Sequence, residues 1–328
     1  MTVMGRFSVF AFALGDPPPA ASEIIAAARH ADSLGFHSIS LPHHLTLPAV
    51  QVYTGFPRRD ILDPLALLPA MAAVTDRILV GTNSAILPVL APYVWARYFA
   101  TLDVLSGGRA LAGMAMGWFE KDFAAARADI KKRARHFDEA LGLIRRLWTE
   151  PSVTHSGETC RLTDMELEPK PLQRPHPPIW IGGHTASIER ASRHAQYLLP
   201  ANLTVEEVRD AYLPRLREQN EKWGTEAGIC LSVRVNVGDD RGADAEMLPR
   251  ISRLVNSRRS PVNDVHKVAI AGSPQHCAER IEEYLQAGVA HFLLDFQYHG
   301  LASVEYSMRQ MDRFVSEVVP LVERKIPA

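Results

Sequence analysis

The sequence of 328 residues predicts an α/β protein whose fold is a (β/α)₈ barrel with insertions. Short apolar stretches alternate with segments of helical period along almost the whole chain, and about eight of these stretches have the length of strands. Eight strands, most of them followed by a helix, favour a closed barrel over an open doubly wound sheet. Barrels of this kind reach about 250 residues and more as one unit. We therefore expect one domain, residues 1–328, with insertions around 151–178 and 239–263.

The first half of the chain contains four strand and helix pairs. The first apolar run superficially resembles a short signal peptide, but Asp16 and three prolines stop it long before the roughly 20 residues that a membrane span needs. We interpret it as a buried strand. The predicted strands are 7–14, 38–41, 77–82 and 109–115, and the predicted helices are 20–34, 63–74, 91–105 and 133–148.

The second half repeats the alternation around two irregular stretches. Residues 151–178 contain six of the 23 prolines and no regular pattern, and residues 239–263 are also irregular. Such stretches in a compact domain are often functional, so we expect them to act as walls or a lid over a site. The predicted strands are 178–183, 197–199, 229–237 and 291–295, and the predicted helices are 186–194, 205–223 with a kink at Pro214, 274–287 and 304–324.

Composition excludes several classes of function. Lys and Arg number 36 against 37 Asp and Glu, a net charge of −1, so no global positive field favours binding to nucleic acid. No stretch is long and apolar enough for a membrane span, so no membrane association is expected. Three cysteines lie far apart, without metal or redox spacing, which favours a reducing cytoplasm.

Common catalytic motifs are also missing from the sequence. There is no G-x-G-x-x-G opening a βαβ unit, no P-loop, no H-E-x-x-H and no G-x-S-x-G. The first strand carries no histidine pair of the kind that metal-dependent hydrolases on this fold use. We therefore predict no metal, and neither a Rossmann dinucleotide site nor a serine hydrolase.

In a (β/α)₈ barrel the active site lies at the carboxyl ends of the strands. His43 and His44 end the second strand, and because alternate residues point to opposite sides, one of them should face the barrel axis. A histidine there can donate a hydrogen bond or shuttle a proton near neutral pH, although a histidine satisfied by a local carbonyl is the plainer alternative. The other candidates are Asn83-Ser84, Met116-Gly117-Trp118 and Gly182-Gly183-His184-Thr185.

The Gly182-Gly183-His184-Thr185 segment joins a predicted strand to a predicted helix. Small residues, backbone N–H groups and a helix N-terminus suit an anionic phosphate. By itself, however, Gly-Gly at a strand end is more often a tight turn.

Several segments in order resemble the bacterial luciferase-like family of flavin-dependent oxidoreductases. The segments are the run from Ala100 to Arg109 followed by Gly113 and Gly117-Trp118-Phe119-Glu120, the run from Phe137 to Trp148, the run from Pro177 to Gly183, and Ala271-Gly272-Ser273-Pro274 with Ala287-Gly288-Val289. The similarity spans nearly the whole chain. It implies a commonly dimeric barrel that binds reduced FMN, used with O₂, or the deazaflavin coenzyme F420.

The resemblance also assigns roles to individual residues. It implies that His44 is catalytic and that Asn83-Ser84 forms a non-prolyl cis peptide behind the cofactor ring. It places Trp118 in the substrate pocket, where the residue could equally be a packing aromatic. The implied cofactor contacts are His43, Asn83, Ser84, Met116, Gly182, Gly183, His184 and Thr185.

Two departures from the family pattern bear on the reaction. His43 stands where relatives often carry Asp or Glu, and Trp118 stands where sugar-phosphate-oxidising deazaflavin members carry an acid. Both favour reduced FMN and oxygen. The resulting expectation is a two-component monooxygenase that receives reduced FMN from a separate reductase and oxidises a small organic substrate. The alternatives are F420-dependent hydride transfer and a flavin-binding protein without catalysis.

Overall fold

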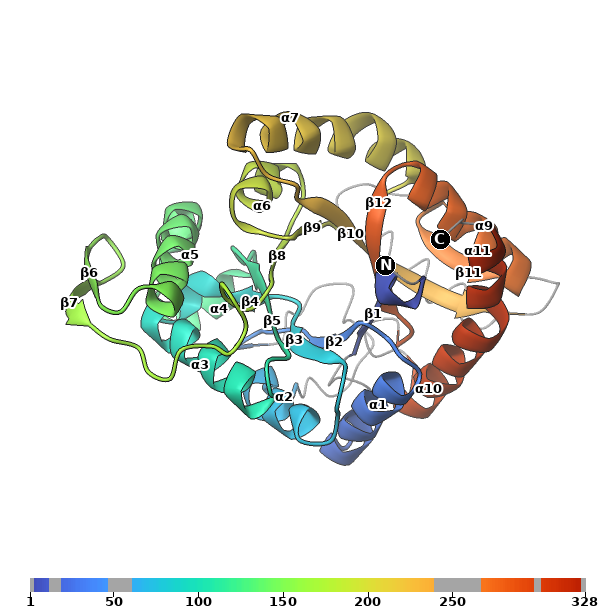
Figure 1. Cartoon of the computed structure of the whole chain (residues 1–328), viewed down its shortest axis with the longest axis horizontal. Helices are drawn as coiled ribbons and strands as arrows, with labels where there is room; N and C mark the ends of the chain where they lie inside the picture. Colours follow the sequence, from blue (N-terminus) through green and yellow to red (C-terminus); the bar gives the residue numbers. More distant parts are fainter. Residues whose placement is uncertain (1–2, 12–18, 47–60, 239–266, 298–301, 326–328) are drawn as a thin grey trace.

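Eight parallel strands close into a barrel (Figure 1). The computed structural model describes residues 3–11, 19–46, 61–238, 267–297 and 302–325. The ring closes because one strand, β10, pairs with both β9 and β12, and β12 pairs with β1. The predicted fold class is therefore confirmed. In ring order the strands are β1 (Phe7–Phe10), β2 (Ser38–Leu41), β3 (Leu79–Thr82), β5 (Ala110–Ala115), β8 (Ile179–Gly182), β9 (Tyr197–Leu199), β10 (Gly228–Val237) and β12 (Val289–Asp295).

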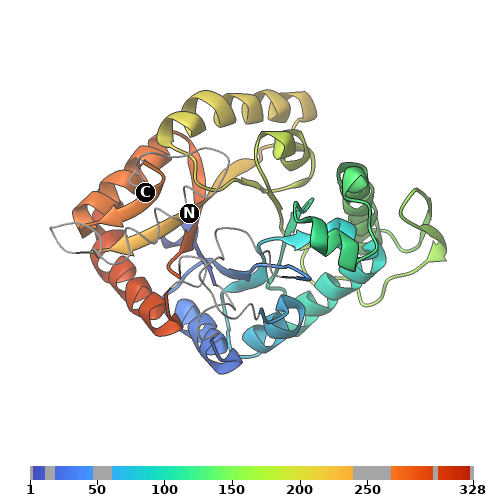
Figure 2. The same ribbon diagram turned by 180° about the vertical axis from the view of Figure 1, so that it is seen from behind.

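Helices surround the barrel in both views (Figures 1 and 2). The predicted helix 205–223 is divided: residues Glu207–Tyr212 are π-helical, and the α-helical part begins next to Pro214, which lacks a backbone N–H. The α-helices are α1 (Ala21–Ser33), α2 (Pro64–Ala72), α3 (Pro92–Leu105), α4 (Glu120–Ala125), α5 (Arg133–Thr149), α6 (Ile188–His194), α7 (Leu213–Trp223), α9 (Pro274–Gln286), α10 (Val304–Arg313) and α11 (Val319–Lys325).

Four strands lie outside the predicted set. The strand β4 (Ala85–Ile86) pairs with β5, and β11 (Ala269–Gly272) pairs with the carboxyl half of β10. The expectation that 151–178 is irregular throughout is wrong, because β6 (Val153–Ser156) and β7 (Arg161–Met165) form an antiparallel hairpin there. β4 has only two residues, and the hairpin strands carry mostly polar residues, so neither gives the apolar pattern of a buried strand.

The hairpin lies outside the helix layer, beyond α5 (Figure 1). It is fixed there by contacts to the outer helices: Tyr93 on α3 donates to the Glu166 carbonyl, and Lys170 donates to the carbonyls of Leu147 and Glu150. These contacts hold the segment against the outer helices and give no support to the expectation that 151–178 covers or walls the barrel mouth. The second insertion, 239–263, and the predicted strand positions 12–14 lie outside the described residues.

Apolar side chains fill both the barrel and the space between barrel and helices. The outer layer includes the fully buried Trp95 and Phe99 of α3 and Trp148 of α5. No helix in the described part of the chain has both the length and the apolarity that crossing a bilayer requires. The barrel interior holds a separate cluster of Phe10, Leu111, Trp180, Tyr197, Leu199, Cys230 and Leu293.

Candidate active site

The two histidines that end β2 have different surroundings, as the alternation of side chains along a strand predicts. His43 is 2% exposed; its Nδ1 accepts a hydrogen bond from the backbone N–H of Ile86 (3.3 Å) and its ring packs edge-on against Trp95 of α3. His43 is thus directed toward the helix layer, and this placement does not support the cofactor contact that the resemblance implies for it.

His44 pairs with a buried carboxylate. Its Nδ1 lies 2.7 Å from Oδ2 of Asp122, which is 0% exposed and sits on α4, 78 residues away in the sequence. The second carboxylate oxygen, Oδ1, accepts hydrogen bonds from the backbone N–H groups of Leu45 (3.0 Å) and Thr46 (2.9 Å). One carboxylate therefore fixes both the imidazole and the backbone that follows it.

The charge on Asp122 follows from this set of donors. Burial raises the pKa of the carboxyl group, but the hydrogen bonds from His44 and Thr46 outweigh it, so the pKa lies below its ordinary value. Ionised Asp122 accepts a hydrogen bond from Nδ1–H of His44, which leaves Nε2 as the nitrogen outside this pair. This is the arrangement by which a carboxylate orients a catalytic histidine.

Trp118 lies beside this pair at the carboxyl end of β5. Its indole is 53% exposed and edge-on to the His44 ring, with centroids 6.1 Å apart. Gly117 precedes it with φ +76°, and a Cβ there would lie 2.5 Å from Ile86 Cγ2, so only glycine fits this turn. Met116 is partly buried against the core. Trp118 and His44 thus form one exposed wall of the mouth.

The ends of β3 and β8 contribute a neighbouring surface. The Asn83-Ser84 peptide is cis, as the resemblance implies. A Cβ on Gly182 would lie 2.6 Å from Ser84 Oγ and 3.4 Å from Ala115 Cβ, so the backbone of β8 approaches Ser84 across the end of β5. Asn83, Ser84 and Gly182 therefore lie together at the mouth.

The loop after β8 continues this surface. Gly183 has φ +141°, and a Cβ on it would lie 2.3 Å from Ser187 Oγ. His184 and Thr185 are exposed, and His184 Nδ1 is 2.9 Å from the hydroxyl of Tyr212. Thr185 begins a short 3₁₀ helix, Thr185–Ser187, whose first N–H groups have no partner within the helix.

Sequence reasoning missed three charged residues near the mouth. Asp122 gave no signal because its pairing with His44 joins distant segments. Arg234 and Asp295 are in register on β10 and β12, 2% and 1% exposed, with Arg234 Nε 3.8 Å from Asp295 Oδ2. A charged residue within each apolar strand is the signal that could have found this pair, since such residues are rarely buried unless paired.

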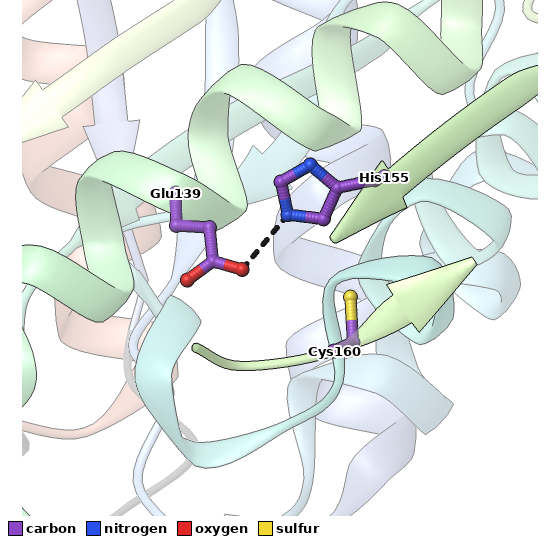
Figure 3. A group of neighbouring side chains, drawn as sticks. All are labelled: Glu139, His155 and Cys160. Carbon is purple, nitrogen blue, oxygen red and sulfur yellow. Dashed lines mark hydrogen bonds and ion pairs between the residues drawn. The ribbon is translucent and has the colours of Figure 1, made fainter. Parts of the chain in front are cut away.

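Glu139, His155 and Cys160 form a group whose atoms lie close enough to hold a metal ion, at the hairpin rather than the mouth (Figure 3). His155 Nε2 donates to Glu139 Oε1 (2.8 Å), and both carboxylate oxygens accept the backbone N–H of Thr159. The Gly157 backbone packs directly over them, since a Cβ there would lie 1.8 Å from Oε1. These contacts describe a hydrogen-bonded anchor for the hairpin loop.

The sequence model of the luciferase-like monooxygenase family matches residues 4–291. The chain belongs to this family. Some relatives of this chain are named as FMN-dependent enzymes and others as F420-dependent enzymes. The chain is therefore placed among the flavin- or F420-dependent oxidoreductases.

Two relatives illustrate both cofactors. An FMNH(2)-dependent dimethylsulfone monooxygenase of Pseudomonas putida is 27% identical over 311 residues, covering 84% of this chain and 83% of that protein. An F420-dependent glucose-6-phosphate dehydrogenase of Kineococcus radiotolerans is 29% identical over 284 residues, covering 79% and 82%. The crystal structure of monooxygenase RslO1 from Streptomyces bottropensis matches with a TM-score of 0.79 at 25% identity, covering 96% of this chain and 99% of that one.

Proposed function

We propose that this luciferase-like protein is the oxygenating component of a two-component monooxygenase, which uses reduced FMN and O₂ on a small organic substrate. The observation that carries the proposal is the His44–Asp122 pair beside the exposed indole of Trp118. A proton-exchanging histidine and an uncharged aromatic wall suit the oxidation of a neutral organic molecule.

The residues at the ends of β3 and β8 fit a flavin. Gly182 and Gly183 leave open backbone where any side chain would collide with Ser84 or Ser187. The exposed loop through Thr185 supplies N–H groups for the cofactor phosphate, as helix N-termini commonly do. In this proposal Asn83, Ser84, Met116 and Gly182 contact the ring, and Gly183, His184 and Thr185 contact the phosphate.

The chain's own residues then have separate tasks. Bound reduced FMN supplies the electrons with which O₂ is activated for transfer to the substrate. His44 Nε2 gives or accepts a proton at the reacting centre, and Asp122 holds the imidazole in the orientation and tautomer that this requires. Trp118 packs against the substrate and excludes water from one side.

A partner follows from the proposed chemistry. The chain lacks the dinucleotide-binding fingerprint with which a single protein could bind NAD(P)H in a Rossmann unit and reduce its own flavin. The named relative from P. putida depends on FMNH(2), a reduced cofactor. We therefore include a separate flavin reductase in the proposal.

F420-dependent hydride transfer is the second candidate, and the relative from K. radiotolerans supports it. The two candidates differ in their need for oxygen. In the F420 case, His44 would exchange the substrate's proton while hydride moves between substrate and deazaflavin. The exposed Trp118, which offers no charge to a sugar phosphate, favours the FMN proposal.

The test is an anaerobic titration of the purified protein with reduced FMN and, separately, with reduced F420, followed by rapid admission of air. We expect reduced FMN to bind, and air to produce a transient absorbance that belongs to neither reduced nor oxidised flavin. Binding of F420 but not FMN, with turnover that does not depend on oxygen, would overturn the FMN proposal. Binding without turnover on any oxidisable or reducible substrate would leave a flavin-binding protein.

The His44→Ala variant tests the residue that carries the proposal. We expect cofactor affinity to stay within a few-fold while turnover falls by about 10²–10⁴, the usual contribution of a positioned acid or base. Trp118→Phe is the matched control at the same wall, since it keeps an aromatic surface and should lower turnover far less. Normal turnover by His44→Ala with bound cofactor would show that His44 has no catalytic task.

A further inference from the structure

A cavity of about 480 Å³ opens at the amino-terminal ends of the strands, at the opposite end of the barrel from the mouth. Its lining includes the first residues of β3 and β8, Leu79 and Ile179, and the residues that precede β2 and β9, His37 and Gln196. The outer wall comes from α5, from the end of α6 and from the loop before β8. Its volume lies within the range that small-molecule sites occupy.

The charged groups that line this cavity are all basic in type. Three permanent positive charges converge there from separate parts of the chain: Arg145 from α5, Arg174 from the loop before β8, and Arg193 from α6. No carboxylate is among the described lining residues, and none of the described carboxylates forms an ion pair with these three guanidinium groups. Like charges that face one cavity without a counterion repel each other, and an anion would remove that cost.

Arg145 is the most constrained of the three. Its Nη1 donates a hydrogen bond to Nδ1 of His194 (2.8 Å), and its Nε is buried with no hydrogen-bond partner among the described residues. A buried guanidinium nitrogen without an acceptor is costly, because the group has lost water and gained nothing in return. An acceptor in the cavity would satisfy this donor set.

The histidines respond to the same positive field. Burial, Arg145 and Arg193 together lower the pKa of His194 to about 4, and burial, reinforced by Arg145, lowers that of His176. His176 Nδ1 is 2.8 Å from the Pro177 carbonyl. Both rings are therefore neutral at pH 7 and act as polar walls, while the guanidinium groups carry the charge.

Acidic side chains on neighbouring elements have other partners. Glu189, four residues before Arg193 on α6, lies 3.8 Å from Lys222 Nζ. Asp103 is 0% exposed and accepts hydrogen bonds from the backbone N–H of Ala110 and from the backbone and side chain of Gln173. Asp138 accepts two hydrogen bonds from Arg190, which does not line the cavity. Arg193 is held in place by the ring of Trp223, 4.3 Å from its guanidinium carbon. The positive lining is therefore preorganised rather than neutralised.

We propose that this cavity is a binding site for a multivalent oxyanion of the phosphate or phosphate-ester class, held by Arg145, Arg174 and Arg193. Arginine suits this ligand because its planar fork matches phosphate oxygens two at a time. The site lies at the opposite end of the barrel from the glycine loop proposed for the cofactor phosphate. The proposal does not depend on which cofactor the mouth takes.

The test is calorimetric titration of the cofactor-free protein, in low-salt chloride buffer, with orthophosphate, pyrophosphate and glycerol 3-phosphate in turn. We expect saturable binding that weakens as chloride is raised. A preference for orthophosphate or pyrophosphate identifies a free inorganic anion, and a preference for the ester identifies a phosphorylated metabolite. Absence of binding by all three probes at about 10 mM would overturn the proposal.

Two variants and one control locate the binding. Arg145→Gln and Arg193→Gln should each weaken the anion at least about tenfold, the effect of losing one charged hydrogen-bonding group. Arg190→Gln removes an arginine from the same helix as Arg193, but outside the cavity, and should leave the affinity unchanged. If Arg145→Gln does not fold, the exposed Arg193→Gln decides alone. Affinity that survives these substitutions, or falls equally in Arg190→Gln, would place the anion elsewhere and contradict the proposal.

Discussion

The two ends of the barrel interior use histidine in opposite ways. At the mouth, His44 has one ring nitrogen paired with a carboxylate, and 13% of its side chain is exposed. At the amino-terminal end, which we call the floor, His291 is 0% exposed and its Nε2 lies 2.7 Å from the hydroxyl of Ser8. The same side chain can exchange protons at one end and only packs at the other.

The partners explain the difference. His44 is paired with an ionised carboxylate, whereas His291 is paired with the neutral hydroxyl of Ser8. Burial, reinforced by His37 and Arg6, lowers the pKa of His291 well below its ordinary value. Aromatic rings surround the imidazole, with Trp180 and Tyr197 centred 5.1 and 5.3 Å from the His291 ring. In (β/α)₈ barrels, residues at this end serve stability while the opposite end serves catalysis.

The largest expected effect comes from changing the mouth's carboxylate. Asp122→Asn can keep an oxygen for the N–H groups of Leu45 and Thr46. Its NH₂ group then faces His44 in place of the charged oxygen. We expect turnover to fall by about 10²–10⁴, because the imidazole loses the carboxylate that fixes its orientation and tautomer. The measurement is kcat, with thermal unfolding as a check on folding. Wild-type kcat in a folded Asp122→Asn protein would show that Asp122 has only a structural role.

His43 is adjacent to His44 in the sequence, yet it is buried like His291 at the floor. Burial lowers its pKa to about 4, slightly reinforced by His44 and opposed by Asp63 and Asp122. His43 stays neutral in the folded protein while the unfolded chain binds a proton near pH 6.5, so the free energy of unfolding falls as pH drops from 6.5 toward 4. The difference between the pKa of 6.5 in the unfolded chain and about 4 in the folded protein corresponds to about 3 kcal/mol of unfolding free energy.

The measurement for His43 is urea unfolding at a series of pH values between 7 and 4. His43→Asn keeps an oxygen acceptor for the Ile86 N–H and should make the pH dependence shallower by the share of one histidine, because His194 and His291 contribute in the same direction. His276→Asn, at an exposed position on α9, is the matched control and should keep the wild-type slope. An unchanged slope in His43→Asn would mean that His43 becomes protonated without unfolding the protein.

The barrel was largely predictable from the sequence because its strands are short apolar runs between helices of clear period. The bounds of β2 and β9 were predicted to the residue, and all eight ring strands were predicted at the correct places. The two-residue β4, the four-residue β11 and the polar hairpin at 153–165 were missed. The polar hairpin carries no apolar pattern, and β4 is too short for one. The apolar β11 is as long as β2, so its apolar run could have identified it.

The candidate site was predictable in outline only. The rule that active sites lie after the strands selected His44, Asn83 and Trp118 from position alone. It could not select Asp122, because a hydrogen bond over 78 residues leaves no trace in local spacing. It also could not separate His43 from His44, since the register of β2 decides which ring meets α3.

A smaller effect is expected at the floor. The hydroxyl of Ser38 donates to Ser8, and the Ser8 hydroxyl is hydrogen-bonded to Nε2 of His291, so Ser8→Ala leaves two buried polar groups without their partner. We expect a loss of about 1–3 kcal/mol in the free energy of unfolding and no change in kcat. Thr154→Ala, which removes an exposed hydroxyl of the hairpin, should cost less on the same assay. A large fall in kcat for Ser8→Ala would show that the floor residues contribute to catalysis as well as to stability.

The smallest effect is expected at the hairpin, which lies at neither end of the barrel. Burial raises the pKa of Glu139, but hydrogen bonds from His155 and Thr159 outweigh it, so the carboxylate stays ionised at neutral pH and loses this role only as pH falls through its lowered pKa. In Glu139→Gln one accepting oxygen becomes a donor that faces backbone N–H groups, at a cost of about 1 kcal/mol.

We expect Glu139→Gln to give faster amide hydrogen exchange confined to residues 153–165. The unfolding midpoint and kcat should stay close to wild type, because this anchor contacts neither the barrel interior nor the mouth. Glu166→Gln is the control, since the structure uses only the backbone carbonyl of that residue. Unchanged exchange in Glu139→Gln would show that the apolar contact of Val153 with the core holds the hairpin without the carboxylate.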